Sequence, residues 1–240
     1  MKITVVIPVY NERETLAPLA EQVRNHLSSH EHRILFVDDG STDGSWDALR
    51  ALHARYDDID ALRFRRNFGK TAALAAGFER ADGDVVITMD SDLQDDPKEV
   101  SRFIGKLEEG YDVVCGWKVK RRDPWTKTIP SRIYNRVVSW MFGIELHDVN
   151  CGYKALRTDV AKRLPLRRDM HRLIPVLAAR LGARVTEIAV EHHPRRWGAS
   201  KYGIERFWQG IRDALLIFFS KRHARGLPDT ASYVAEELRH

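Results

Sequence analysis

The sequence predicts an α/β fold with a mainly parallel central sheet flanked by helices. Two observations support this prediction. Along the first half of the chain, short apolar segments alternate with segments in which apolar residues recur at helical spacing. The helical segments are about 10–17 residues long, which suits right-handed crossovers between parallel strands.

Five strands are expected before residue 118, because each segment is short and carries an apolar run. Two of them end in acidic residues, and parallel sheets bind ligands beyond the carboxyl ends of their strands. The five segments are ITVVIPV (3–9), RILFVDDGS (33–41), DALRFRR (60–66), DVVITMD (84–90) and YDVVCGW (111–117).

Four helices are expected between these strands. One segment is rich in alanine, the strongest helix former, and another opens with a proline, which suits the first turn of a helix. The four segments are 11–27, 44–56, 69–81 and 97–110.

The pattern changes after residue 118. A basic loop is expected at 118–127, a helix at 129–143, a strand running into a basic loop at 183–203, and a helix at 204–225. We expect one domain at 1–220, with amphipathic helices at about 129–142 and 204–219, and a basic C-terminal tail at 221–240. The apolar faces of the helices consist of Ile129, Ile133, Val137 and Met141 in the first, and of Ile204, Phe207, Trp208, Ile211, Leu215 and Phe218 in the second.

Composition limits the possible functions. The net charge of +5 and the pI near 9.2 are compatible with phosphate-bearing ligands, nucleic acid or an anionic membrane surface. Cys115 and Cys151 form no CxxC pair, so we expect neither a zinc site nor a disulfide framework, and a reducing cytosol is the simplest setting. The N-terminal apolar run is too short for a signal peptide, and no run approaches the roughly 20 residues that span a bilayer. We therefore expect no transmembrane segment.

The segment TMDSDLQDDP (88–97) carries five carboxylates directly after an expected strand. Asp90 and Asp92 lie one residue apart, so both can face a hard divalent cation that also binds substrate phosphates. The alternative is a solvated acidic loop. Asp95 and Asp96 precede Pro97 and a helix, and for them capping of that helix is the preferred interpretation.

Two further loops follow strands. In VDDGSTDGS (37–45), Asp38 and Asp39 can bond a ribose hydroxyl or a base edge, or the cluster can be a turn with Ser41 or Asp43 as a helix cap. In PVYNERE (8–14), a proline, an aromatic ring, Asn and Glu can cradle a base. Asn11 and Glu14 can equally form a capping box variant, and the two interpretations are compatible.

Two segments carry lysine beside glycine. NFGKTAA (67–73) is not a phosphate loop, because Phe64 stands where that motif needs glycine; a helix start is expected instead. RRWGASKYG (195–203) places three cations around Gly198 and is either an anion-gripping loop or a solvated charge run.

Five motifs, IPVYNE, VDDGSTDG, MDSDLQDDP, NCGYKALR and RRWGASKYG, in this order and spacing, resemble family 2 glycosyltransferases. Within that family the chain is most similar to polyprenyl-phosphate sugar transferases, which include dolichyl-phosphate mannose synthase. The resemblance covers about residues 2–220 and implies the GT-A fold, a single Rossmann-like nucleotide-binding domain.

The resemblance also implies roles for individual residues. The loop around the nucleotide base corresponds to Pro8, Tyr10 and Glu12, and the contacts to base and ribose to Val37 and Asp39. Ser91 replaces the usual alanine of the D-x-D motif. Lys118 falls where mannose synthases carry arginine, so the positive charge is kept but the bidentate guanidinium group is absent. The motif residues Asp90 and Asp92 are implied to bind metal and nucleotide, Gln94 to belong to the metal shell, and Arg195 and Lys201 to bind the diphosphate.

The expected reaction is a single inverting displacement on a GDP- or UDP-sugar. Mg²⁺ or Mn²⁺ held by Asp92 would stabilise the leaving diphosphate together with Arg195 and Lys201. A polyprenyl (dolichyl or undecaprenyl) phosphate acceptor is already ionised and needs no strong base. A saccharide or other hydroxyl acceptor would need one, and Asp148 is the candidate, although a structural role for it is equally compatible.

The amphipathic helices and basic loops favour a peripheral protein on an anionic membrane surface, at its cytoplasmic face. Two other interpretations remain: a transferase that acts on soluble acceptors, and a nucleotide-binding scaffold without catalysis. Nucleic acid is not an expected partner, because the sequence carries no recognised binding motif and its basic residues lie beside acidic strand ends.

Overall fold

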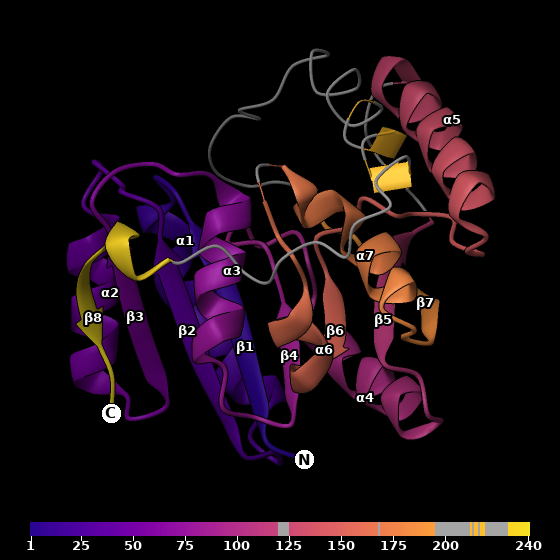
Figure 1. Cartoon of the computed structure of the whole chain (residues 1–240). Helices are drawn as coiled ribbons and strands as arrows, with labels where there is room; N and C mark the ends of the chain where they lie inside the picture. Colours follow the sequence, from indigo (N-terminus) through magenta and orange to yellow (C-terminus); the bar gives the residue numbers. More distant parts are fainter. Residues whose placement is uncertain (120–124, 168, 195–211, 213, 216, 219–229) are drawn as a thin grey trace.

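The computed structural model describes residues 1–119, 125–167, 169–194, 212, 214–215, 217–218 and 230–240. In these ranges a single mixed sheet has the strand order β7-β5-β6-β4-β1-β2-β3-β8 (Figure 1). The strands are β1 (Ile3–Val9), β2 (His32–Asp38), β3 (Ile59–Phe64), β4 (Val85–Thr88), β5 (Val113–Lys118), β6 (Lys154–Arg157), β7 (Val185–Val190) and β8 (Val234–Leu238).

Most strands of the sheet are parallel. β1 pairs with β2 and β4, β2 with β3, and β5 with β7, all in parallel. β6 runs antiparallel between β4 and β5, and β8 pairs antiparallel with β3. The predicted α/β class with a mainly parallel sheet is therefore confirmed.

Helices cover both faces of the sheet. α1, α2 and α4 lie on one face, and α3, α6 and α7 lie on the other (Figure 1). Successive side chains of a strand point to opposite faces of the sheet. Ile3, Val5 and Ile7 of β1 therefore pack in the core beneath α1, α2 and α4, whereas Val6 packs in the core beneath α3, α6 and α7. The helices are α1 (Arg13–His26), α2 (Ser45–Arg55), α3 (Lys70–Arg80), α4 (Val100–Glu108), α5 (Trp125–Phe142), α6 (Thr158–Arg163) and α7 (Ile174–Arg180), with 3₁₀ turns at Pro97–Glu99, Met170–Leu173 and Ala231–Tyr233.

The expected elements before residue 118 are all present, with shifted ends. The strand expected at 84–90 ends at Thr88, so the acidic motif leaves the sheet as a loop. The sequence analysis assigns neither β6 nor β8. β6 has four residues, and two of them are charged, so no apolar run reveals it.

The C-terminal residues close the sheet beside β3. Trp46 Nε1 donates to Glu236 Oε2 at 3.0 Å, and the ring of Tyr233 stacks on Phe68 with centroids 4.2 Å apart. The predicted division into a domain at 1–220 and a tail at 221–240 stays a prediction, but β8 shows that residues 234–238 of this tail join the sheet.

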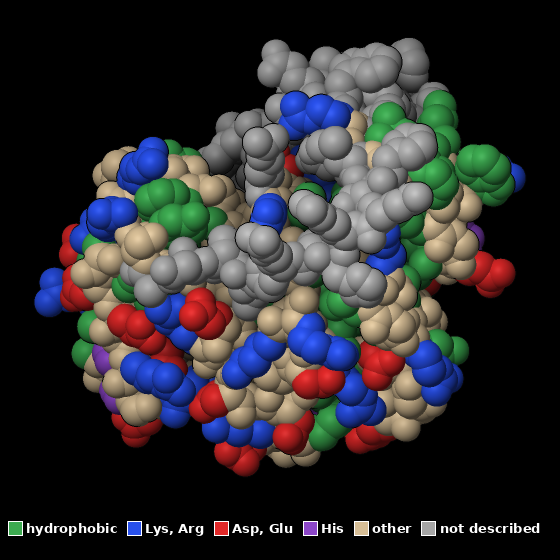
Figure 2. Space-filling model, in the orientation of Figure 1, with side chains coloured by type: hydrophobic (Ala, Val, Ile, Leu, Met, Phe, Trp, Pro, Cys, Tyr) green, Lys and Arg blue, Asp and Glu red, His purple; other side chains and the backbone are tan. Residues whose placement is uncertain are grey.

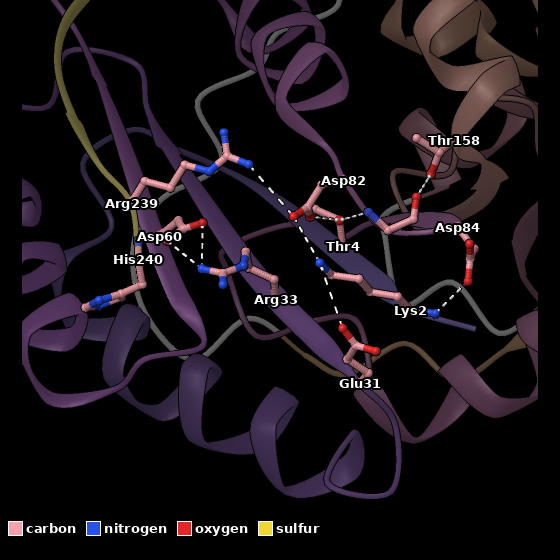
Figure 3. A network of polar contacts seen from close by, with 11 residues as sticks. Lys2, Thr4, Glu31, Arg33, Asp60, Asp82, Asp84, Thr158, Arg239 and His240 are labelled. Carbon is pink, nitrogen blue, oxygen red and sulfur yellow. Dashed lines mark hydrogen bonds and ion pairs between the residues drawn. The ribbon is translucent and has the colours of Figure 1, made fainter.

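A polar network ties the chain together at the amino ends of β1, β2 and β3 (Figure 3). Arg33 donates to both carboxylate oxygens of Asp60 at 2.9 and 3.0 Å. Lys2 lies 3.0 Å from Asp82, and Arg239, which follows β8, lies 3.8 Å from the same carboxylate. These contacts lie at the edge opposite the acidic strand ends, and we assign them to stability.

Gly77 sets the distance between α3 and β1. A Cβ at Gly77 would lie 2.3 Å from Val6 Cγ1, closer than packed atoms approach. We expect Gly77→Ala to destabilise the protein by about 1–3 kcal/mol through overpacking. The measurement is urea unfolding monitored by circular dichroism.

Gly105 of α4 provides the matched control, because no described atom lies within 4 Å of a Cβ built there. Gly105→Ala should stabilise the protein by about 0.5–1 kcal/mol, the usual gain for this change inside a helix. Equal effects of the two substitutions would contradict this account of the α3–β1 contact.

Candidate active site

The carboxyl ends of β1, β2 and β4 bring the predicted site segments to one edge of the sheet. The loops after β1 and β2 hold each other directly: Asn11 N donates to Ser41 Oγ at 2.9 Å, and Thr42 N donates to Asn11 Oδ1 at 2.8 Å. Glu12 N donates to Ser45 Oγ at 3.1 Å. These bonds fix the loops relative to each other, so they form one surface.

Of the capping alternatives for these loops, those for Asn11 and Ser41 do not hold, whereas Asp43 Oδ1 accepts from Ser45 N, at the first residue of α2, at 2.9 Å. Glu12, not Asn11, precedes the first turn of α1, and the Asn11 side chain bonds the neighbouring loop instead. Asn11 has a φ of +53°, in the left-handed region that Asn tolerates better than most residues. Ser41 likewise accepts from Asn11 rather than capping α2. Both side chains therefore join the two loops.

The residues expected around a nucleotide base differ in exposure. The Tyr10 side chain is 37% exposed, and Pro8 and Glu12 are half-buried beside it. Val37 is fully buried in the core beneath α3. Their contacts to a nucleotide stay predictions.

Asp39 organises the loop that precedes α3. Its two carboxylate oxygens accept from Phe68 N at 2.6 Å and from Gly69 N at 2.8 Å. Burial raises the pKa of Asp39 to about 6, although the two amides favour the ionised form. Burial also raises the pKa of Asp38, which accepts from Ser41 N at 2.9 Å. Each carboxylate oxygen has a further lone pair, so the predicted ribose contact of Asp39 remains compatible with these bonds.

The D-x-D motif forms the loop after β4. Asp90 pairs with the Lys70 ammonium through Oδ1. Asp92 Oδ1 accepts from Gln94 N at 3.2 Å. Ser91, which lies between Asp90 and Asp92, is buried. Burial opposes ionisation of Asp90, but the charges of Lys70 and Lys118 outweigh it and hold the pKa of Asp90 well below its usual range. Asp90 is thus held in its ionised form, and both motif aspartates offer carboxylate oxygens, the kind of ligand that Mg²⁺ and Mn²⁺ prefer.

Asp95 contacts both the backbone of this motif and the Lys118 side chain. Its Oδ2 accepts from Asp90 N at 3.2 Å, and its Oδ1 lies 3.1 Å from Lys118 Nζ, with both side chains largely buried. The prediction of Asp95 as a helix cap is therefore wrong, whereas Asp96 does cap the next turn by accepting from Lys98 N at 3.0 Å. Burial lowers the pKa of Lys118, but the Asp95 charge overrides it and raises the pKa overall.

Gln94 links the motif loop to the segment after β7. Gln94 Nε2 donates to His193 O at 3.0 Å. The role of Gln94 in a metal shell stays a prediction. Close by, ligand atoms of Asp96, Glu191 and His193 lie within 4.8 Å of one another. Lys98 already pairs with Asp96 and Glu191 of this surface cluster, at 3.1 and 2.9 Å.

Asp148 is only 2% exposed and lies in a network that joins α5 to the loop before β6. Asn135 Nδ2 donates to His147 O at 3.0 Å and lies 3.5 Å from Asp148 Oδ1, and Asp148 N donates to Glu187 Oε2 at 3.3 Å. Burial and these contacts favour the structural role for Asp148 over that of a catalytic base.

Three residues near the motif escaped the sequence analysis. Lys70 contacts Asp90, and His171 Nδ1 lies 2.8 Å from the hydroxyl of Thr71, the residue that follows Lys70 in α3. A Cβ at Gly152 would lie 2.8 Å from Asp90 Oδ2, so glycine permits this approach. The lysine beside glycine at the start of a helix was a usable signal for Lys70, and Gly152 lies in the motif NCGYKALR; the sequence around His171 carries no signal that locates it here.

Arg195, Lys201 and Trp208 lie outside the described residues, so their predicted roles stay predictions. The apolar stripe expected on α5 is partly visible. Ile133 and Val137 are 54% and 46% exposed, while other α5 side chains, Tyr134 and Val138, pack inward. Trp140 of the same helix is 83% exposed, and Figure 2 shows hydrophobic side chains at the surface in this region. In the part of the chain that the structure describes, no helix is long and apolar enough to span a bilayer.

Residues 4–172 match the family described as Glycosyl transferase family 2. The chain is 37% identical over 230 residues to dodecaprenyl-phosphate galacturonate synthase from Rhizobium johnstonii, covering 93% of this chain and 68% of that protein. It is 38% identical over 203 residues to undecaprenyl-phosphate 4-deoxy-4-formamido-L-arabinose transferase from Pseudomonas syringae pv. syringae, covering 83% of this chain and 60% of that protein.

The fold also resembles a solved structure. Glucosyl-3-phosphoglycerate synthase from Mycobacterium tuberculosis, in complex with Mn²⁺, uridine diphosphate and phosphoglyceric acid, superimposes with a TM-score of 0.70 at 21% identity, covering 90% of this chain and 78% of that one. At that identity the likeness concerns the fold alone. The matched domain and the two curated relatives establish that the chain belongs to glycosyl transferase family 2 and is a glycosyltransferase.

Proposed function

We propose that this enzyme transfers a sugar from a nucleotide diphosphate sugar, a UDP- or GDP-sugar, to a polyprenyl phosphate. The observation that carries the proposal is the D-x-D loop beside the interlocked loops after β1 and β2. The relatives named for dodecaprenyl and undecaprenyl phosphates support a lipid-phosphate acceptor.

The residues of the D-x-D loop fit a divalent cation, Mg²⁺ or Mn²⁺. Asp90 and Asp92 would hold it, because both present carboxylate oxygens and Asp90 already binds one cation, the Lys70 ammonium. When bound, such an ion would neutralise charge that develops on the leaving diphosphate. Lys118 holds Asp95 in place, and Asp95 in turn fixes the Asp90 backbone, so the pair acts as positioning residues.

We further propose a single displacement with inversion at the sugar carbon. A phosphate monoester acceptor is ionised at neutral pH, so this enzyme does not need a strong general base to activate it. The burial of Asp148 is consistent with that mechanism. A hydroxyl acceptor would require a base at this edge, and no contact described above favours Asp148 for that task.

The acceptor also bears on where the enzyme works. We propose peripheral binding at the cytoplasmic face of a membrane through the exposed stripe Ile133, Val137 and Trp140 of α5. Arg136 is exposed on the same helix, and Lys120, Arg121 and Arg122 precede this helix in the sequence, so the sequence combines apolar and cationic groups as interfacial helices do. Leu215 and Phe218, 40% and 46% exposed, add to this surface, since Phe218 meets Phe142 of α5 edge to face at 5.8 Å.

The first experiment measures sugar transfer to a short polyprenyl phosphate from labelled UDP- and GDP-sugars, with Mn²⁺ or Mg²⁺. Asp92→Asn should lower transfer by about 100-fold or more, because the variant lacks a carboxylate that would hold the cation against the leaving diphosphate. Asp96→Asn is the control and should retain activity, since Asp96 caps a turn and pairs with Lys98 and His193 instead of belonging to the D-x-D pair. Full activity of Asp92→Asn in the presence of EDTA would contradict the proposed chemistry.

The second experiment tests membrane binding by sedimentation with phosphatidylglycerol vesicles. Trp140→Glu should weaken binding by about tenfold or more, because burying a large apolar side chain contributes about 1.5–3 kcal/mol. Trp140 is 83% exposed, so the change should leave the melting temperature unaltered. Ala51→Glu, on an exposed position of α2, adds the same charge elsewhere and should bind normally. Unchanged binding of Trp140→Glu would exclude α5 as the docking surface.

A further inference from the structure

Lys70 occupies the accessible side of the first motif aspartate. Its ammonium pairs with Asp90 Oδ1, and the two side chains are 23% and 33% exposed. Gly152 lies against both oxygens, since a Cβ built there would come within 2.8 Å of Oδ2 and 3.0 Å of Oδ1, so this side of the carboxylate is closed. A cation that approaches Asp90 from the open side therefore meets the oxygen that Lys70 already holds.

The backbone places Lys70 there against its local preference. Lys70 begins α3, and the first turn, Lys70–Ala73, contains no acid to balance it. A cation at this end of a helix faces the positive end of the macrodipole, which is unfavourable. Gly69 precedes it with a φ of +92°, a conformation suited to glycine, and Asp39 holds the amide of Gly69 at 2.8 Å. The ion pair with Asp90 offsets the unfavourable position.

Lys118 does not fill the same role. Its Nζ lies 3.1 Å from Asp95 Oδ1, and the Asp95 side chain is fully buried, so this pair is closed to an incoming ligand. Lys70 is partly exposed and carries a flexible four-carbon stem, so its ammonium can move while its backbone stays fixed. Of the two lysines, Lys70 is the one able to exchange partners.

We propose that Lys70 is a built-in counter-ion of Asp90 that couples binding of the divalent cation to binding of the donor. The cation displaces the Lys70 ammonium from Asp90, and the ammonium then pairs with the donor's diphosphate. Cation and nucleotide diphosphate therefore bind with positive cooperativity, each strengthening the other by the same factor. This inference rests on the proposed function and names a binding residue that the D-x-D motif does not include.

The test measures Mn²⁺ affinity from the electron paramagnetic resonance signal of unbound Mn²⁺, without nucleotide and with UDP or GDP. Lys70→Met removes the competing charge and keeps the length of the side chain. Without nucleotide, this variant should bind Mn²⁺ about tenfold more tightly than the wild type, a difference of about 1.4 kcal/mol. The tightening that UDP or GDP causes should be smaller in this variant than in the wild type, because only direct contact between the cation and the diphosphate then links the two ligands.

Two controls isolate the effect of Lys70. Lys70→Arg keeps the charge and should retain weak nucleotide-free binding of Mn²⁺. Lys106→Met removes another lysine from a carboxylate pair, at 2.7 Å from Glu109 Oε2, and should leave the Mn²⁺ affinity unchanged. Lys70→Gln serves as a second neutral variant, and melting temperatures confirm that each protein is folded.

The outcomes separate this inference from the proposed function. If the wild type binds Mn²⁺ with a nucleotide, and neither neutral variant binds nucleotide-free Mn²⁺ more tightly than the wild type, the counter-ion role is wrong and the proposed function stands. If the wild type binds no Mn²⁺ with either nucleotide, the cation requirement fails, and the inference fails with it.

Discussion

Charge balance at the carboxyl edge of the sheet is the constraint on which the site depends. Of two carboxylates in the motif loop, Asp95 is fully buried and Asp90 is one-third exposed, and each is matched by a lysine from another element. Asp95 pairs with Lys118 at the end of β5, and Asp90 pairs with Lys70 at the start of α3. The first pair is closed and holds the loop, whereas the second is open and can be exchanged for a ligand.

The topology of the sheet makes this balance possible. β4 lies between β1 and β6, so the loop after β4 is bounded on one side by the loops after β1 and β2 and on the other by the segment before β6. Gly152 of that segment lies against the Asp90 carboxylate. Thr88 Oγ1 donates to Gly152 O at 2.7 Å, and this bond holds Gly152 close to the motif loop. A larger residue at 152 would push the motif out of place, so the antiparallel strand β6 contributes to the site without a functional group of its own.

Local patterns in the sequence predict the sheet and part of the site. Acids that directly follow an apolar run identify the D-x-D loop, and alternating strand and helix segments indicate the sheet. Local patterns do not place Lys70, His171 or Gly152 beside Asp90, because their place depends on how distant segments meet. The Asp95 error has the same origin: its partner Lys118 lies at the end of another strand, so the local sequence suggested only a cap.

The sequence alone also did not determine which face of the amphipathic helix α5 is buried. α5 carries apolar residues on two faces, and packing turns Tyr134 and Val138 inward, which leaves Ile133 and Val137 at the surface. The spacing showed that a stripe exists but not which neighbour it meets. The exposed stripe gains functional meaning only beside the lipid-phosphate relatives, because an isolated apolar surface identifies no partner.

The most direct test of the central claim is anomalous diffraction at the manganese edge from crystals grown with Mn²⁺ and UDP or GDP. The account predicts a peak at about 2.0–2.2 Å from a carboxylate oxygen of Asp92, with the Lys70 ammonium no longer on Asp90. A peak only at the surface cluster of Asp96, Glu191 and His193, with Lys70 still paired to Asp90, would contradict it.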